Sequence, residues 1–131
     1  MHTMRPQERQ RLSRLRREAD RLVRTCQGLL EELLRPGPLI AGSFYEMYKR
    51  CGRPGCRCAR GDLHGPFPVV AVAREGRRST RSVPRDRVQE VRHKTLAYRT
   101  FQQKRRQLER AMRRLTEIVK AIRDAHLEEV R

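Results

Sequence analysis

The chain has 131 residues, of which 36% are charged and 37% hydrophobic, and it contains no tryptophan. This length fits one domain, or one small module on long helices, and the composition argues against a wide globular core. The formal net charge of +17 favours a polyanionic partner such as DNA, RNA or an acidic protein. No stretch approaches the roughly 18 apolar residues that a membrane span needs, so we expect no membrane partner.

Residues 6–34 are predicted to form a helix, because apolar side chains recur there at alternating steps of three and four. Cys26 lies in this heptad seam and is interpreted as a small buried side chain rather than a metal ligand. Three further residues widen the stripe toward the end of the helix, which indicates packing against more than one surface: Val23, Leu30 and Leu34. The seam consists of Leu12, Leu15, Ala19, Leu22, Cys26, Leu29 and Leu33.

After Pro36 ends this helix, the composition becomes typical of β structure. Strands are predicted over residues 42–50 and 66–74, which are rich in aromatic and branched side chains. Glu75 and Gly76 are predicted to form a hairpin turn whose return strand covers residues 77–83. We therefore expect a three-stranded antiparallel sheet. The two prolines of the second strand place its start at an edge or outside the ladder; they are Pro66 and Pro68.

A glycine-rich loop with the spacing Cys-x4-Cys-x-Cys-x5-His joins the first two predicted strands. Thiolate sulfur and imidazole nitrogen are preferred ligands of tetrahedral zinc, and a Cys3His set closes a structural site. A disulfide, a redox switch or small buried cysteines are the alternatives. We see no apolar targeting segment and expect a cytoplasmic protein with reduced thiols, which favours zinc. We predict structural Zn²⁺ bound by Cys51, Cys56, Cys58 and His64.

From residue 85 to the end of the sequence there is no glycine or proline, which predicts one helix of about 45 residues. Its apolar stripe is predicted to run through Val88, Val91, Tyr98, Phe101, Leu108, Met112, Leu115, Val119 and Ile122, with Ala111, Ile118 and Ala125 beside it. We expect an α+β fold in which a long antiparallel, coiled-coil-like helical hairpin is capped by the small sheet and its zinc loop. The corresponding segments are 1–35, 36–84 and 85–131.

Basic side chains surround the predicted loop and hairpin, and residues 36–87 carry eleven basic and four acidic residues. A hairpin with basic residues at alternate positions fits a groove or follows a phosphate backbone. We therefore predict nucleic-acid contacts for Lys49, Arg50, Arg53, Arg57, Arg60, Arg74, Arg77, Arg78, Arg81 and Arg85. On the helices the charges are as well explained by a solvated face.

Four aromatic residues flank the predicted metal site: Phe44, Tyr45, Tyr48 and Phe67. If they are exposed beside arginines, they provide surfaces for stacking on unpaired bases. If they are buried, they form the small core between sheet and helix. The low aromatic content of the chain favours the second interpretation.

The order of motifs resembles a known family. Gly42 and Ser43, an aromatic strand, CG-x-P-x-CRCA, HGP, an apolar strand, an EG hairpin and V-P before a long helix are similar to a family of small uncharacterised prokaryotic proteins. That family is described as a domain of unknown function and is loosely associated with mobile elements. The resemblance covers Gly42 to about Arg99. It implies no activity, but it implies that the cysteine loop and the hairpin form one unit.

No phosphate-binding loop, nucleophile elbow or paired carboxylates in a plausible cleft are found, and four protein ligands would leave zinc no position for water. We therefore do not expect an enzyme. The prediction is a zinc-stabilised basic nucleic-acid-binding protein, with DNA favoured over RNA, acting as an accessory factor. The alternative is a helical scaffold or adaptor that binds an acidic protein or self-associates as a homodimer, with the C-terminal helix as the contact.

Overall fold

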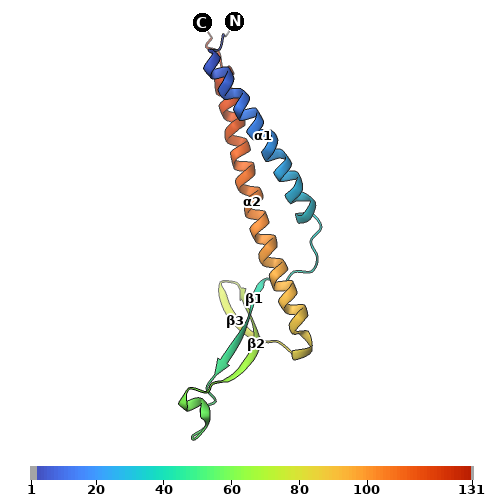
Figure 1. The fold of residues 1–131 in the computed structure, drawn as a ribbon, viewed down its shortest axis with the longest axis vertical. Helices are drawn as coiled ribbons and strands as arrows, with labels where there is room; N and C mark the ends of the chain where they lie inside the picture. Colours follow the sequence, from blue (N-terminus) through green and yellow to red (C-terminus); the bar gives the residue numbers. More distant parts are fainter. Residues whose placement is uncertain (1–2, 131) are drawn as a thin grey trace. The chain divides into compact units, whose positions relative to one another are not determined.

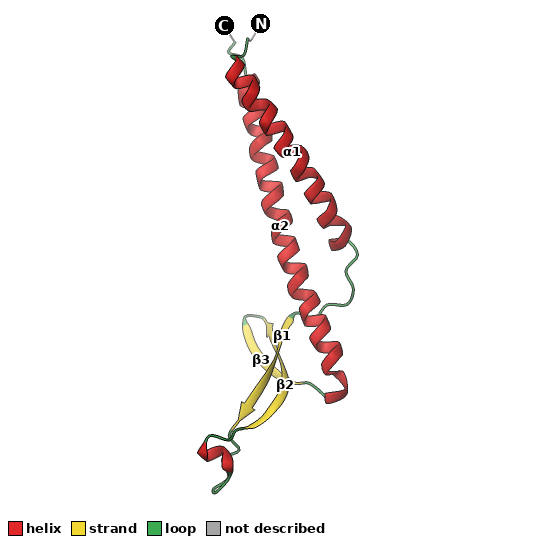
Figure 2. Cartoon of the chain, in the orientation of Figure 1, coloured by secondary structure: helices red, strands yellow, loops and turns green. Residues whose placement is uncertain are grey.

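The computed structural model describes residues 3–130, so residues 1–2 and 131 of the predicted end segments lie outside the described residues. The chain forms two long α-helices, α1 (Pro6–Leu33) and α2 (Val88–His126), and one three-stranded antiparallel sheet, which confirms the α+β class (Figure 2). It divides into two compact units. One combines α1 with α2 from Gln102 onward, and the other spans Gly37–Phe101.

The seam of α1 lies where the heptad pattern placed it. Leu12, Cys26 and Leu29 are buried, and the other four predicted seam residues are half-buried. Pro6 occupies the first helical turn, where its missing N–H would have no helical partner. The residues expected to widen the stripe are instead exposed: Val23 by 44%, Leu30 by 37% and Leu34 by 71%.

The seam of α2 differs from the prediction by one residue. Ala111 and Ile118 are buried, whereas Met112 and Val119 are 54% and 63% exposed. Assigning Met112 and Val119 to the central stripe was therefore wrong. Each residue turns an α-helix by about 100°, so a shift of one position moves a side chain from the buried face to its flank. The observed seam continues through the half-buried Leu108, Leu115, Ile122 and Ala125.

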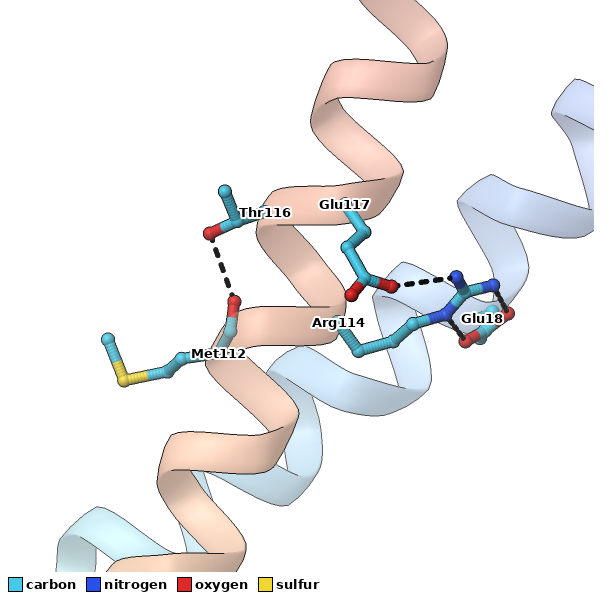
Figure 3. Close-up of polar contacts among 5 residues, drawn as sticks. All are labelled: Glu18, Met112, Arg114, Thr116 and Glu117. Carbon is cyan, nitrogen blue, oxygen red and sulfur yellow. Dashed lines mark hydrogen bonds and ion pairs between the residues drawn. The ribbon is translucent and has the colours of Figure 1, made fainter.

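Two ion pairs join α1 to the second part of α2. Arg114 binds Glu18 through two hydrogen bonds, with Nε 2.6 Å from Oε2 and Nη2 2.9 Å from Oε1 (Figure 3). Lys104 Nζ lies 2.6 Å from Glu32 Oε2. Glu32 follows Glu18 in α1, whereas its partner Lys104 precedes Arg114 in α2, so the two helical segments run antiparallel. The start of α1 therefore lies beside the end of α2 (Figure 1). The Arg114 guanidinium lowers the pKa of the Glu18 carboxyl.

The sheet consists of β1 (Gly42–Lys49), β2 (His64–Arg74) and β3 (Arg77–Ser82), in that order, as predicted. Glu75 and Gly76 form the predicted turn, with φ of 52° and 75°. β2 begins earlier than expected, because its first residues pair with β1 alone, in a part of the strand that β3 does not reach. In this part the register aligns Lys49 with His64. Pro66 and Pro68 lie in this part, where Pro68 O accepts a hydrogen bond from Val83 N.

The unit of residues 37–101 also contains the start of α2. A short 3-10 turn (Arg85–Arg87) precedes the helix, which therefore begins at Val88 rather than directly after Pro84. Glu90 joins this turn to the helix through Lys94, at 2.6 Å, and Arg87, at 3.2 Å. These two cations, with Lys94 first, lower the pKa of Glu90 to about 2.

One face of the sheet contacts α2. The Arg92 guanidinium lies 4.8 Å from the centre of the Phe44 ring and 3.7 Å from Glu46 Oε1. Val83, Val91 and Thr95 are buried in the same unit. Neither α1 nor α2 contains an apolar segment long enough to cross a lipid bilayer, as judged over residues 3–130.

Candidate metal centre and basic surface

The four predicted ligands converge at the end of the β1–β2 ribbon. Cys51 follows β1, Cys58 lies in a 3-10 turn (Arg57–Arg60) that Cys56 precedes, and His64 is the first residue of β2. One ligand atom from each lies within 4.8 Å of the other three. The resulting cluster of four is able to hold a metal ion. The expectation that two strands meet at the cluster is confirmed.

The interatomic distances suit tetrahedral ligation. Cys51 Sγ lies 3.4 Å from Cys58 Sγ, and Cys56 Sγ lies 3.2 Å from His64 Nε2. Zn–S bonds of about 2.3 Å would hold two thiolates of a tetrahedral site roughly 3.8 Å apart, so the cluster needs only small adjustments to close around an ion. The thiols are free, and Cys26, the fourth cysteine, is buried in the seam of α1.

The local backbone prepares Cys58 for metal binding. The Cys51 N–H donates a hydrogen bond to Cys58 Sγ at 3.3 Å. This bond is the main reason why the pKa of the Cys58 thiol falls to about 7, although burial of the side chain opposes it. The Arg53 backbone lowers the pKa of Cys51, but the thiols of Cys56 and Cys58 outweigh this effect and raise it. A thiolate is the form that binds metal, so Cys58 is the best-prepared ligand.

Gly65 allows His64 to reach the cluster. Its φ is +138°, and a Cβ at this position would lie 2.7 Å from Met47 O of the neighbouring strand. A side chain would therefore push the two strands apart beside the ligand. The glycine of the HGP motif is explained by this close approach between β1 and β2.

The ten basic residues predicted to contact nucleic acid are all exposed. The sheet register separates the hairpin arginines, however. Arg81 aligns with Val70 and Arg77 with Arg74, which places both on the same face as Phe44, whereas Arg78 aligns with Ala73 on the other face. The alternating basic pattern therefore supplies charge to both faces of the hairpin.

Most of the aromatic residues near the loop are not core residues. Tyr48 is 54% exposed, Phe67 39% and Tyr45 38%. Only Phe44 is half-buried, beneath Arg92. The favoured interpretation of the four as a small core was wrong for three of them, because valines, Thr95 and the cysteine cluster supply the buried side chains instead.

Sequence reasoning missed two groups that shape this region. The Cys51 N–H acts on Cys58 through the backbone, which no residue pattern reveals. Arg92 lies in the α2 charge run, and its contacts with Phe44 and Glu46 depend on where the helix crosses the sheet. The available signal in the sequence was that Arg92 lies soon after the connection from the sheet to α2. Many other arginines of the chain also lie close to the sheet in sequence, so this signal did not single out Arg92.

The chain belongs to the family described as "Domain of unknown function (DUF6788)", which it matches over residues 6–93. This match includes α1, the sheet and the metal cluster, and it extends further toward the N-terminus than the motifs from Gly42 onward. No curated protein and no solved structure matches the chain.

Proposed function

We propose that the chain is a zinc-stabilised, basic nucleic-acid-binding protein, with DNA favoured over RNA as its ligand. The observation that carries the proposal is the set of ten exposed cationic side chains around the cysteine loop and hairpin. Within residues 3–130 none of these ten takes part in an ion pair. Their charge is therefore available to phosphates.

The acidic residues support this proposal by where they pair. Glu18 and Glu32 bind basic side chains of α2, and Glu46 binds Arg92. These three carboxylates are thus neutralised by cations other than the ten, and the loop and hairpin turn add one acidic residue each, Asp62 and Glu75. Each phosphate neutralised by a free cation releases counterions, which gives affinity that decreases steeply with salt.

In this proposal Zn²⁺ has a structural role. Three thiolates and one imidazole would fill its tetrahedral shell and hold Arg53, Arg57 and Arg60 on a fixed loop. No reaction is assigned to the site. We propose an accessory factor that acts in the cytoplasm of a prokaryote and serves a mobile element, with α1 and the second part of α2 as a coiled-coil-like hairpin.

We expect the variant in which Arg77, Arg78 and Arg81 are all glutamine to bind a DNA duplex about tenfold more weakly. Its salt slope should fall by up to about three units, because each lost phosphate contact removes roughly 0.9. Fluorescence anisotropy titrations at several salt concentrations measure both quantities. The matched control replaces Arg9, Arg17 and Arg24 of α1, which removes the same charge. Equal slopes for the two triple variants would rule out the hairpin as the contact.

A second candidate function is self-association as a helical scaffold. Val23, Leu30, Met112 and Val119 are exposed apolar residues of α1 and α2. In an antiparallel heptad pair all four occupy the flank opposite the one used by Glu18 and Arg114. Figure 3 agrees, since Met112 points away from the Arg114–Glu18 pair.

Cations share this flank with the apolar side chains. Arg9, Arg16 and Arg105 occupy the same heptad position as the four apolar residues. The exposed apolar side chains, rather than the charge, are what favour a second copy of the chain.

Native mass spectrometry tests this candidate. We expect a dimer for the unmodified protein and a monomer when Met112 and Val119 are both replaced with glutamate. Replacing the exposed Arg113 and Lys120 with glutamate instead is the control and should leave the dimer intact. A monomeric unmodified protein at micromolar concentration would exclude this function.

A further inference from the structure

The face of the sheet that carries Tyr45 and Phe67 is distinct from the face that contacts α2. Tyr45 aligns with Val69, and Phe67 aligns with Met47. Side chains alternate along a strand and aligned partners share a face, so these four lie together. Phe44 and Glu46, which contact Arg92, lie on the other face. We call the first surface the aromatic face and define it by Tyr45, Phe67, Lys49 and Arg78.

Tyr45 lies flat across the sheet. Its hydroxyl is 3.4 Å from Thr80 Oγ1, and Thr80 belongs to β3 whereas Tyr45 belongs to β1. The phenol ring must therefore cross β2, which lies between them. Val69 of β2 is only 2% exposed although it lies on this face, whereas Tyr45 is 38% exposed. The outward side of the Tyr45 ring is thus a flat, exposed aromatic surface.

Basic side chains lie at both ends of the aromatic face. Lys49 Nζ is 5.7 Å from the centre of the Phe67 ring. Arg78, aligned with Ala73, marks the hairpin end. Apart from the irregular end where Lys49 aligns with His64, the other residues that the three strands contribute to this face are small or apolar and none is acidic: Ser43, Met47, Val69, Ala71, Ala73, Thr80 and Ser82.

We propose that the aromatic face binds single-stranded nucleic acid. Unpaired bases stack on the rings of Tyr45 and Phe67, while Lys49 and Arg78 pair with the phosphates on either side. Base stacking on aromatic side chains accepts every base, so the surface needs no sequence code. A duplex cannot use it, because its bases are already stacked inside. This inference rests on the proposed nucleic-acid binding and names single strands as the ligand of one face.

The competing role of Tyr45 is structural, because its ring covers Val69. A leucine in its place still covers Val69 with apolar atoms but has no flat ring, and a phenylalanine retains the ring but loses the hydrogen bond to Thr80. The two variants therefore separate stacking from cover. Thermal unfolding and zinc content of both variants verify that the sheet is formed.

The test uses the full zinc-loaded chain with a fluorescein-labelled thymidine oligomer of about 15 nucleotides, within the usual range of single-strand sites, and a duplex of the same length. We expect Tyr45→Leu to weaken oligomer binding about tenfold and to leave duplex binding within about twofold. Tyr45→Phe should bind the oligomer like the unmodified protein. Phe67→Leu should repeat the selective loss. Since the chain has no tryptophan, tyrosine emission can be followed, and quenching by an unlabelled oligomer that disappears in Tyr45→Phe assigns the stacking to Tyr45 rather than to Tyr48 or Tyr98.

Each result has a defined meaning. If the unmodified protein binds the duplex and Tyr45→Leu does not change the affinity for the oligomer, single-strand binding by the aromatic face is overturned. The proposed function then still stands. Equal weakening of oligomer and duplex also overturns it, because Tyr45 then acts through the fold. No binding of either ligand by the unmodified protein refutes the proposed function itself. A uridine oligomer separates the two sources of single strand: tighter thymidine binding assigns DNA and tighter uridine binding assigns RNA, and both support stacking.

Discussion

Replacing Cys58 with serine is expected to release the metal ion and to unfold the loop and sheet, while α1 and the second part of α2 stay helical. Cys58 is 2% exposed and accepts the Cys51 N–H. The unit that contains the sheet has few other buried apolar side chains, namely Val69 of β2, Val83 after β3 and Val91 of α2. Structural zinc contributes roughly 10–16 kcal/mol of apparent binding free energy in small peptides, which matches or exceeds the total stability of about 5–15 kcal/mol of an ordinary domain.

Native mass spectrometry and hydrogen exchange measure the two parts of this expectation. The first should show one zinc ion per chain, lost in Cys58→Ser. The second should show loss of amide protection in β1, β2 and β3 only. Far-ultraviolet circular dichroism should retain most of its helical signal, because α1 and the later part of α2 bury their seam within their own unit.

Cys26→Ala provides the matched control. Cys26 is also a buried free cysteine, at 8% exposure, but it belongs to α1 and is not one of the four clustered ligands. This variant should keep the metal ion and the protection of the sheet. If a chelator strips the metal and the sheet amides remain protected, then zinc is not the main support of the sheet.

The ligand set was predictable because all four residues lie in one short loop between two strands. Their types and spacing were enough to group them. The unequal preparation of the thiols was not, because the pKa of Cys58 depends on a backbone N–H whose direction is set by the folded turn. The placement of Arg78 apart from Arg77 and Arg81 also required the register, since a strand pattern gives alternation without saying which face meets the helix.

The aromatic residues show a second limit of the sequence. Phe44 and Tyr45 are neighbours of similar size and hydrophobicity, and they lie on opposite faces of β1. Arg92 covers one, and the other crosses to Thr80. Composition argued that so few aromatics must form the core, but valines fill it instead. The sequence of α2 is ambiguous in a similar way. Met112 and Val119 form one apolar series, Ala111 and Ile118 form another that is shifted by one position, and the pattern alone does not say which of the two is buried.

Ile118→Ala is expected to destabilise the helical unit by about 2–5 kcal/mol, the usual cost of emptying a well-packed buried site. Ile118 is 1% exposed, as is Leu12 on the other helix of the unit. The neighbouring Val119 is 63% exposed, so Val119→Ala should change the free energy of unfolding by less than about 0.5 kcal/mol. Urea unfolding followed by circular dichroism at 222 nm measures both, at protein concentrations low enough to keep the chain monomeric.

This pair of variants decides between the two seams. The sequence pattern alone placed Val119 in the central stripe and Ile118 beside it, whereas burial reverses them. A larger loss from Val119→Ala than from Ile118→Ala in the monomer would restore the predicted seam. A loss from Val119→Ala that appears only at high protein concentration would instead identify the flank as the dimer contact, because an exposed residue stabilises the chain only when a second copy covers it.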